Sequence, residues 1–139
     1  MKSVTYVPEH LLPMSTVYTF VDEEGYYWIE EYPINYPEEA ADQVLNGFIF
    51  SIYGLYDYYL LTKDPDVKKI LKASITTVYN YIPEFRDEGD ISFYCLKHHH
   101  KDIKYHFIHQ DQLSTLTNIT GDPFFQAMAD SLYNDHHLL

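Results

Sequence analysis

The sequence has one cysteine, Cys95, and one arginine, Arg86, among its 139 residues. One cysteine excludes an internal disulfide and a structural zinc site built from several cysteines. The formal net charge is −12, and phosphate binding requires clustered Lys and Arg. This charge balance argues against a nucleic-acid partner.

Glycine and long apolar runs are also scarce. The five glycines are scattered singly, so no phosphate-binding glycine loop is present. No apolar run reaches the roughly 18 residues of a membrane-spanning helix. The beginning of the sequence lacks the apolar stretch of a secretory signal. No targeting signal in the sequence indicates a cellular compartment, so a cytoplasmic location is the default expectation.

The order of local patterns predicts a short β-hairpin followed by helices. Residues 1–16 lack periodicity and are expected to form an extended arm. Residues 17–31 contain two β-rich stretches around the turn sequence "DEEG", and Pro33 is expected to end this unit. The domain is expected to continue to residue 134, with a tail at 135–139. Apolar periodicity predicts helices at about 38–62, 65–82, 105–119 and 123–134.

Two similar breaks divide these helices into pairs. "TKDP" and "TGDP" each place an aspartate before a proline, which are residues typical of a helix cap and a first helical position. Helix–TxDP–helix therefore occurs twice, as in proteins built from helical hairpins. The predicted fold class is mainly α, with helical hairpins of an α/α-toroid (a partial barrel) preceded by a short β-hairpin.

"VLNGF" contains Asn-Gly, the strongest two-residue hairpin signal, inside the first predicted helix. The flanking residues do not alternate, so we predict that Asn46 and Gly47 are helical. Gly47, Ser51 and Gly54 then share one face. That face suits either close packing of another helix or approach of a ligand to the backbone.

The connection at about 84–104 is long and rich in histidine, which raises the question of metal binding. His98, His99 and His100 are adjacent and cannot converge easily, and no HExxH pattern accompanies His106 and His109. We therefore predict no metal site. Cys95 has His98 nearby in sequence, but nothing marks it as an activated nucleophile.

Fifteen tyrosines are unusually many for a chain of this length. Tyrosine rings either fill a half-buried core or offer flat, amphipathic surfaces of the kind that sugar-binding clefts use. Three sequence motifs indicate a functional role for a few of these tyrosines. The motifs are "EEYP…VLNGFIFSIYGLYDYYLLT", "SFYCL" and "YHFIHQDQLSTLTNITGDPFF". In order and spacing, these motifs resemble the C-terminal domain of D-glucuronyl C5-epimerases over about Val17 to Leu132.

The resemblance implies an α-helical toroid that needs no organic cofactor and acts on a uronate-containing polysaccharide of the heparan type. It implies inversion of D-glucuronate to L-iduronate by removal and return of the C5 proton. That reaction requires proton-transfer groups on both faces of one carbon and stabilisation of charge on the uronate carboxylate. The matching positions here are Glu31, Tyr32, Tyr94 and Tyr105 as catalytic residues. Substrate-binding residues are expected to be Asn46, Arg86, His106 and His109.

Some features depart from the family pattern and leave other functions open. Cys95 stands where the family has an aspartate, and residues matching the family's upstream β-rich domain are absent from this sequence. A non-catalytic carbohydrate-binding or assembly subunit and a uronate lyase-like enzyme are the alternatives. Two hairpins do not close a barrel, so we expect either a homodimer or docking onto the missing β-rich segment.

Overall fold

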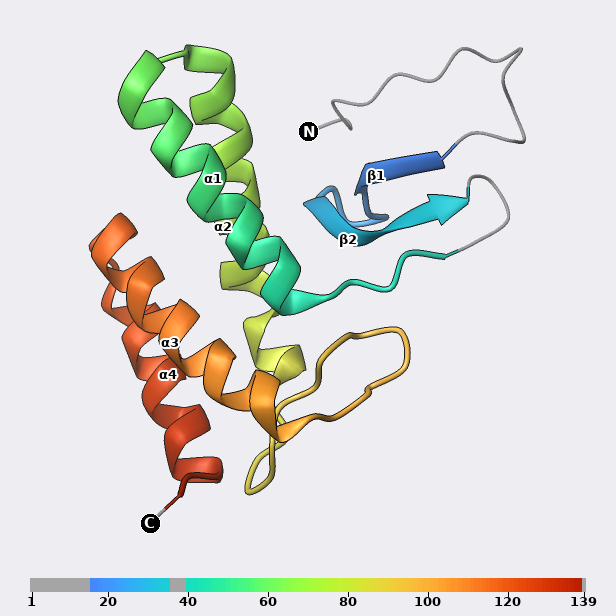
Figure 1. Ribbon diagram of the computed structural model, residues 1–139, viewed down its shortest axis with the longest axis vertical. Coiled ribbons are helices and arrows are strands. Elements are labelled where there is room, and N and C mark those ends of the chain that lie inside the picture. The colour runs from blue at the N-terminus through green and yellow to red at the C-terminus, as the bar shows by residue number, and fades with distance from the viewer. Residues whose placement is uncertain (1–15, 36–39, 139) are drawn as a thin grey trace.

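A computed structural model of the chain describes residues 16–35 and 40–138. Of the arm expected at 1–16, only Thr16 is described, and it begins the first strand. Six elements follow one another along the chain (Figure 1). They are β1 (Thr16–Val21), β2 (Tyr27–Asn35), α1 (Leu45–Thr62), α2 (Pro65–Phe85), α3 (Ile103–Thr120) and α4 (Pro123–Asp135). The mainly α class with a preceding hairpin is therefore confirmed.

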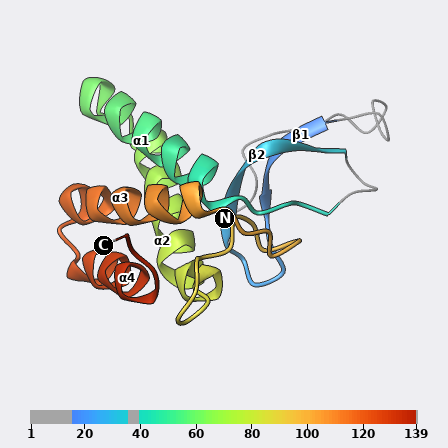
Figure 2. The same cartoon turned by 60° about the horizontal axis from the view of Figure 1, so that its bottom comes forward.

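The two strands form an antiparallel hairpin that lies to one side of the helices (Figure 2). Asp22 shapes its turn, because Oδ1 accepts hydrogen bonds from the backbone N–H groups of Glu24 and Tyr26. Gly25 supplies the left-handed conformation there, with φ of 93°. The expected end of the hairpin at residue 31 is wrong, since β2 continues through Pro33 to Asn35.

The predicted start of α1 near residue 38 is also wrong, although Asn46 and Gly47 are helical as predicted. Residues 40–44 precede the helix in a non-helical conformation, and the earlier part of the expected start, 36–39, lies outside the described residues. Val44 forms an isolated antiparallel bridge with Cys95. The backbone groups of this segment thus find partners in a distant loop rather than in a helical turn.

The two TxDP breaks have the same structure, as predicted. Each helix ends at a residue in the left-handed conformation, Lys63 after α1 and Gly121 after α3. Asp64 then caps α2 and Asp122 caps α4, each through its side chain. The helix α2 continues three residues beyond its expected end, and it contains Pro83 in its last turn at the cost of one backbone hydrogen bond.

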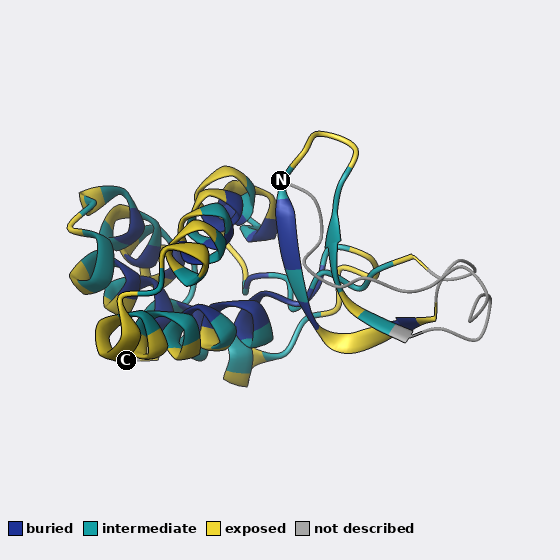
Figure 3. Cartoon of the chain, turned by 90° about the horizontal axis from the view of Figure 1, so that it is seen from above, coloured by how far each residue is buried: buried dark blue, intermediate teal, exposed yellow. Residues whose placement is uncertain are grey.

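The core lies between the helices and the inner face of the hairpin (Figure 3). Strand β2 packs against both α1 and α2, and α1 also contacts α3. Burial of one large apolar side chain contributes roughly 1.5–3 kcal/mol. The largest fully buried side chains are Trp28, Tyr27, Phe48, Phe85, Phe125, Leu45, Ile49, Ile52, Ile82, Leu113, Leu116 and Leu132. Among the described helices, none has the length and apolar character needed to cross a bilayer.

Candidate functional site

A bulge in β2 displaces the sequence "EEYP" from the ladder of the sheet. Val17 pairs with Ile34 and Thr19 pairs with Ile29, so the four residues 30–33 lie opposite Tyr18 alone. Pro33 is tolerated here because a bulged residue needs no ladder hydrogen bond. The bulge directs the side chains of the motif away from regular alternation and toward the loop between α2 and α3.

Three predicted catalytic residues meet at this bulge. The Tyr94 hydroxyl donates a hydrogen bond to Oε2 of Glu31, with 2.6 Å between the oxygens. The hydroxyls of Tyr32 and Tyr94 are 3.1 Å apart. Tyr32 is 49% exposed, so the group opens to solvent. Glu31 and Tyr94 are separated by 63 positions, and the fold brings them together.

The fourth predicted residue, Tyr105, lies in the first turn of α3 and contacts the same group. Its ring centroid is 4.7 Å from that of Tyr94, with the rings tilted by 55°. The Nζ atom of Lys104 lies 5.5 Å from the centre of the Tyr105 ring. The structure thus brings Glu31, Tyr32, Tyr94 and Tyr105 into one contact group with a cation at its edge, and their catalytic role stays a prediction.

Tyr94 is held by its backbone as well as by its side chain. Its N–H donates to the carbonyl of His100, at 2.6 Å, and its carbonyl accepts from Leu45 N–H at 3.2 Å. The next residue, Cys95, is buried, and its backbone forms an isolated β-bridge with that of Val44. The connection at 86–102 is irregular, yet it is tied firmly to the start of α1.

Gly47 explains part of the glycine pattern in α1. A Cβ atom at this position would lie 2.7 Å from Cβ of Glu31, closer than any ordinary contact. The side chain of the catalytic candidate Glu31, rather than another helix, lies against the bare backbone here. Gly54, by contrast, has nothing within 4 Å of such an atom.

The environment determines which of these groups carries a proton. Burial, followed by the hydrogen bonds to Glu31 and Tyr32, raises the pKa of Tyr94 well above its ordinary value. Tyr94 is therefore neutral at physiological pH and donates to Glu31. The pair combines a hydrogen-bond donor with a carboxylate acceptor, which is the combination that proton transfer at carbon requires.

The hydrogen bonds of the predicted substrate-binding residues go to groups outside the four-residue cluster. Asn46 is buried, and its backbone carbonyl accepts from Nε2 of Gln112. Arg86 makes two hydrogen bonds to the carboxylate of Asp135, at 2.7 and 2.9 Å. Among the described residues, no hydrogen bond joins either side chain to the tyrosine cluster.

His106 and His109 have no exposed surface, so neither can touch a substrate from solvent. Nδ1 of His106 accepts the backbone N–H of Ser92, and its Nε2 lies 2.9 Å from the carbonyl of Leu132. Oγ of Ser92 is 2.8 Å from Nδ1 of His109. These histidines connect the loop, α3 and α4. Within residues 16–35 and 40–138, no group of three His, Cys, Asp or Glu could hold a metal ion.

Sequence reasoning missed Glu30, which is buried beside the cluster at 4% exposure. Its Oε1 accepts the N–H of Gln43 at 2.7 Å. The only sequence signal at this position is the pair of glutamates before Tyr32. Side chains alternate between the two faces of a regular strand, but the bulge interrupts this alternation, so the sequence does not predict which glutamate faces inward.

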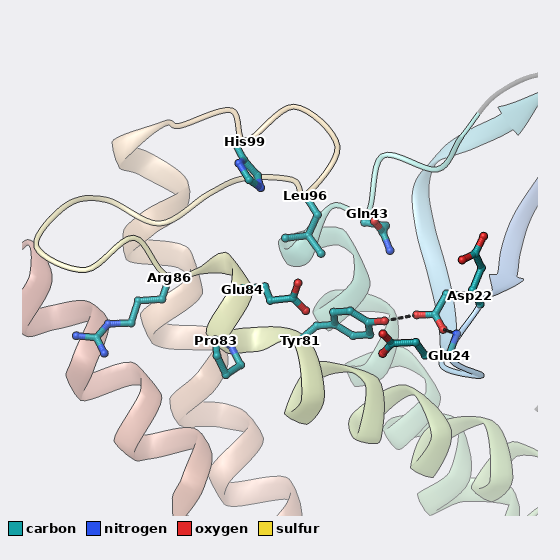
Figure 4. A pocket seen from close by; sticks show the side chains of 10 residues that line it. Asp22, Glu24, Gln43, Tyr81, Pro83, Glu84, Arg86, Leu96 and His99 are labelled. Carbon is teal, nitrogen blue, oxygen red and sulfur yellow. Dashed lines mark hydrogen bonds between the residues drawn. The ribbon is translucent and has the colours of Figure 1, made fainter.

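A cavity of about 600 Å³ lies between the hairpin turn, the end of α2 and the loop that carries Leu96 and His99 (Figure 4). The turn after β1 and the end of α2 border it, and Tyr81 donates to Asp22 across it. Its lining includes Asp22, Glu23, Glu24 and Glu84 but none of the four clustered residues. A hollow with so many carboxylates repels an anionic sugar, so the tyrosine cluster is the better candidate site.

Comparison with known proteins identifies the family of the chain. Residues 13–133 match the family model described as D-glucuronyl C5-epimerase C-terminus. The uncharacterized protein MJ1128 of Methanocaldococcus jannaschii is 30% identical over 102 residues, which is 73% of this chain and 32% of that protein. The chain thus spans about a third of the length of this relative. Because the family model covers most of the sequence, the chain belongs to the D-glucuronyl C5-epimerase C-terminal family.

Proposed function

We propose that the cluster inverts C5 of D-glucuronate residues in a heparosan- or heparan-type polysaccharide, giving L-iduronate. The observation that carries this proposal is the direct hydrogen bond from the Tyr94 hydroxyl to Glu31 at a solvent-open position. An epimerase needs one group that removes the C5 proton and another that supplies a proton to the opposite face. A carboxylate and a neutral phenol fit these two roles.

The proposed reaction has two proton transfers. The uronate ring enters between Glu31 and Tyr94 and replaces their direct hydrogen bond. The Glu31 carboxylate takes the C5 proton, and the C–H electron pair moves onto the uronate carboxylate as an enediolate. Tyr94 then donates its proton to the opposite face of C5. When the product leaves, the protonated Glu31 returns a proton to the Tyr94 phenolate across the restored 2.6 Å contact.

The remaining cluster residues support binding. Tyr32 exposes half of its surface and offers a ring face and a hydroxyl to the sugar. Tyr105 lies against the Tyr94 ring and limits its movement. These contacts hold the reacting groups in place before the substrate arrives, which lowers the entropic barrier.

Lys104 supplies the positive charge that the enediolate requires. Lys97, Lys101 and Arg86 all pair with aspartates, whereas Lys104 forms no ion pair within the described part of the chain. A free ammonium beside Tyr105 can approach the uronate carboxylate as its negative charge grows. The chain has a net charge of −12, and such a local cation offsets the repulsion that this charge exerts on an anionic substrate.

The two helical hairpins are proposed to be part of an α/α-toroid whose remaining wall comes from a second copy or from a β-rich segment. The paired TxDP connections support this view, because repeated hairpins of one build are the units of such toroids.

The test is incubation with heparosan in D₂O. Epimerisation predicts that the polysaccharide gains mass at C5 without chain cleavage. New absorbance from unsaturated uronate would instead establish elimination, and binding without either signal would establish a non-catalytic carbohydrate-binding role. Either of these two outcomes contradicts the proposal. Tyr18, which is exposed on β1 opposite the bulge, provides the control variant Tyr18→Phe.

A further inference from the structure

Glu30 occupies an unusual position for a carboxyl group. Its side chain is enclosed directly before the Glu31–Tyr32 pair, and Oε1 accepts the backbone N–H of Gln43. Its Oε2 is buried without a hydrogen-bond partner in the described residues. An incompletely paired buried carboxyl group is unfavourable for folding. Its presence beside the site therefore calls for an explanation other than stability.

Gln43 links this carboxyl group to the loop that carries Tyr94. Its backbone has φ of 58°, a left-handed conformation that is uncommon for a residue with a side chain. Its carbonyl accepts the N–H of Leu96 at 3.2 Å, and the next residue, Val44, bridges to Cys95. A continuous set of contacts thus runs from Glu30 to both sides of Cys95, next to Tyr94. Local backbone strain of this kind persists only where surrounding contacts hold it.

We propose that Glu30 is a positioning residue that fastens the bulge carrying Glu31 and Tyr32 to the Gln43–Leu96 contact beside Tyr94. When the hydrogen bond from Gln43 to Glu30 is lost, the distance between the bulge and the loop is less well fixed. The contact between Glu31 and Tyr94 then loosens. The catalytic part of this inference rests on the proposed function, whereas the structural part does not.

The protonation state of Glu30 connects this attachment to pH. Burial raises its pKa to about 7, against the opposing effect of the hydrogen bond from Gln43. The backbone N–H of Asp42, from the segment before α1, also opposes this rise, whereas the charges of Asp42 and of Glu31, from β2 itself, favour the neutral form. Above this pKa, the hydrogen bond from Gln43 strengthens, but a second negative charge develops beside Glu31 and opposes entry of the anionic uronate. The rate of C5 exchange should therefore decline on the alkaline side with an apparent pKa near that of Glu30.

Two variants test the inference with readouts that do not depend on activity. In Glu30→Leu the acceptor is absent, and exchange of the Gln43 amide should become at least about tenfold faster by NMR. The ¹³Cζ signal of Tyr94 should shift as its hydroxyl loses Glu31. Glu30→Gln keeps an acceptor oxygen without an ionisable group, so it should preserve both signals and remove the alkaline decline. Glu23→Leu, at an exposed glutamate of the hairpin turn, is the control.

Unchanged Gln43 exchange and an unchanged Tyr94 signal in Glu30→Leu would overturn the inference. If Glu30→Leu does not fold, the comparison of Glu30→Gln with the unaltered chain still decides: a retained alkaline decline refutes the role of Glu30. If the unaltered chain shows no C5 exchange while both NMR signals respond in Glu30→Leu, the proposed function fails and the positioning role stands.

Discussion

Glu31 and Tyr94 form a pair in which one residue accepts and the other donates, and each role is set by its surroundings. Gly47 leaves space for the Glu31 side chain, and burial keeps Tyr94 neutral. A phenol that stays protonated has a proton to donate when the substrate arrives, and it can accept one only after it has given that proton up. The chemical roles within the site therefore follow from the local environment and not from residue type alone.

Glu31→Gln should separate geometry from chemistry at this pair. The amide oxygen still accepts the Tyr94 hydroxyl, but it cannot take a proton from C5. We expect C5 deuterium incorporation to fall by about 10²–10⁴-fold, the usual contribution of a general base. The midpoint of urea unfolding should move little, because Glu31 is exposed. An exchange rate within twofold of that of the unaltered chain would rule out Glu31 as the base.

The pH dependence of stability should reveal two buried groups with opposite effects. Burial lowers the pKa of His109 to about 3, so the unfolded chain binds its proton first and stability falls as pH drops below 6.5. Burial raises the pKa of Glu30 to about 7, so the folded chain binds its proton first and stability rises as pH drops toward 4.5. Between pH 6.5 and 5 each effect amounts to about 2 kcal/mol, and the two nearly cancel.

Replacing one group should expose the effect of the other. Glu30→Gln should lose about 2 kcal/mol of unfolding free energy between pH 6.5 and 5, because only the His109 effect remains. His109→Asn should gain a similar amount over the same interval. Urea titrations at these two pH values measure both changes. Parallel profiles for the two variants would contradict the assigned protonation states.

At the scale of elements, the helical pairs were predictable because their signals are local. Asp64 and Asp122 each stand before a proline, and a cap needs only its own turn of helix. The start of α1 could not be predicted in this way, because it depends on the bridge between Val44 and Cys95, 51 positions apart. Pro33 misled the prediction of β2 because a bulge accepts proline.

The buried position of the two histidines of α3 was predictable from their helical spacing, which the motif-based interpretation overlooked. His106 and His109 share a helix face with the buried Leu113 and Leu116, at steps of three, four and three. That periodicity favours an interior position. The resemblance identified the clustered residues but carried no information about burial, so the histidines were expected to bind substrate.

The two glycines of α1 provide a matched pair of substitutions. Gly47→Ala would push the new Cβ atom into Glu31 and displace it from Tyr94, so C5 exchange should fall at least tenfold. Gly54→Ala meets open space and should stabilise the helix by up to about 1 kcal/mol without altering exchange. Exchange assays and thermal unfolding of both variants measure this contrast. Equal activity in the two would contradict the proposed contact.

At the scale of the whole molecule, exposed apolar side chains gather on α1. Phe50, Tyr58 and Leu61 are exposed, and Leu61 is 86% accessible. Several exposed apolar side chains on one helix offer a surface that a partner could cover. A symmetric dimer is the commonest closed arrangement that covers such a surface.

We therefore predict that the chain associates at micromolar concentration. Light scattering should give about twice the monomer mass of 16.5 kDa. The double variant Phe50→Ser/Leu61→Ser should shift the equilibrium toward the monomer while the circular dichroism spectrum is retained. A clean monomer in the unaltered chain would favour docking of a different segment on this face.

The 63-position separation of Glu31 and Tyr94 also determines when the site can exist during folding. Helices form from neighbouring residues in microseconds, whereas closing a long loop must precede any contact between hairpin and loop. A refolding chain should thus regain its far-ultraviolet circular dichroism before the Tyr94 hydroxyl finds its acceptor. Helical content alone is then a poor indicator of a working site, and mutations that slow hairpin docking can delay activity in a chain that already appears folded.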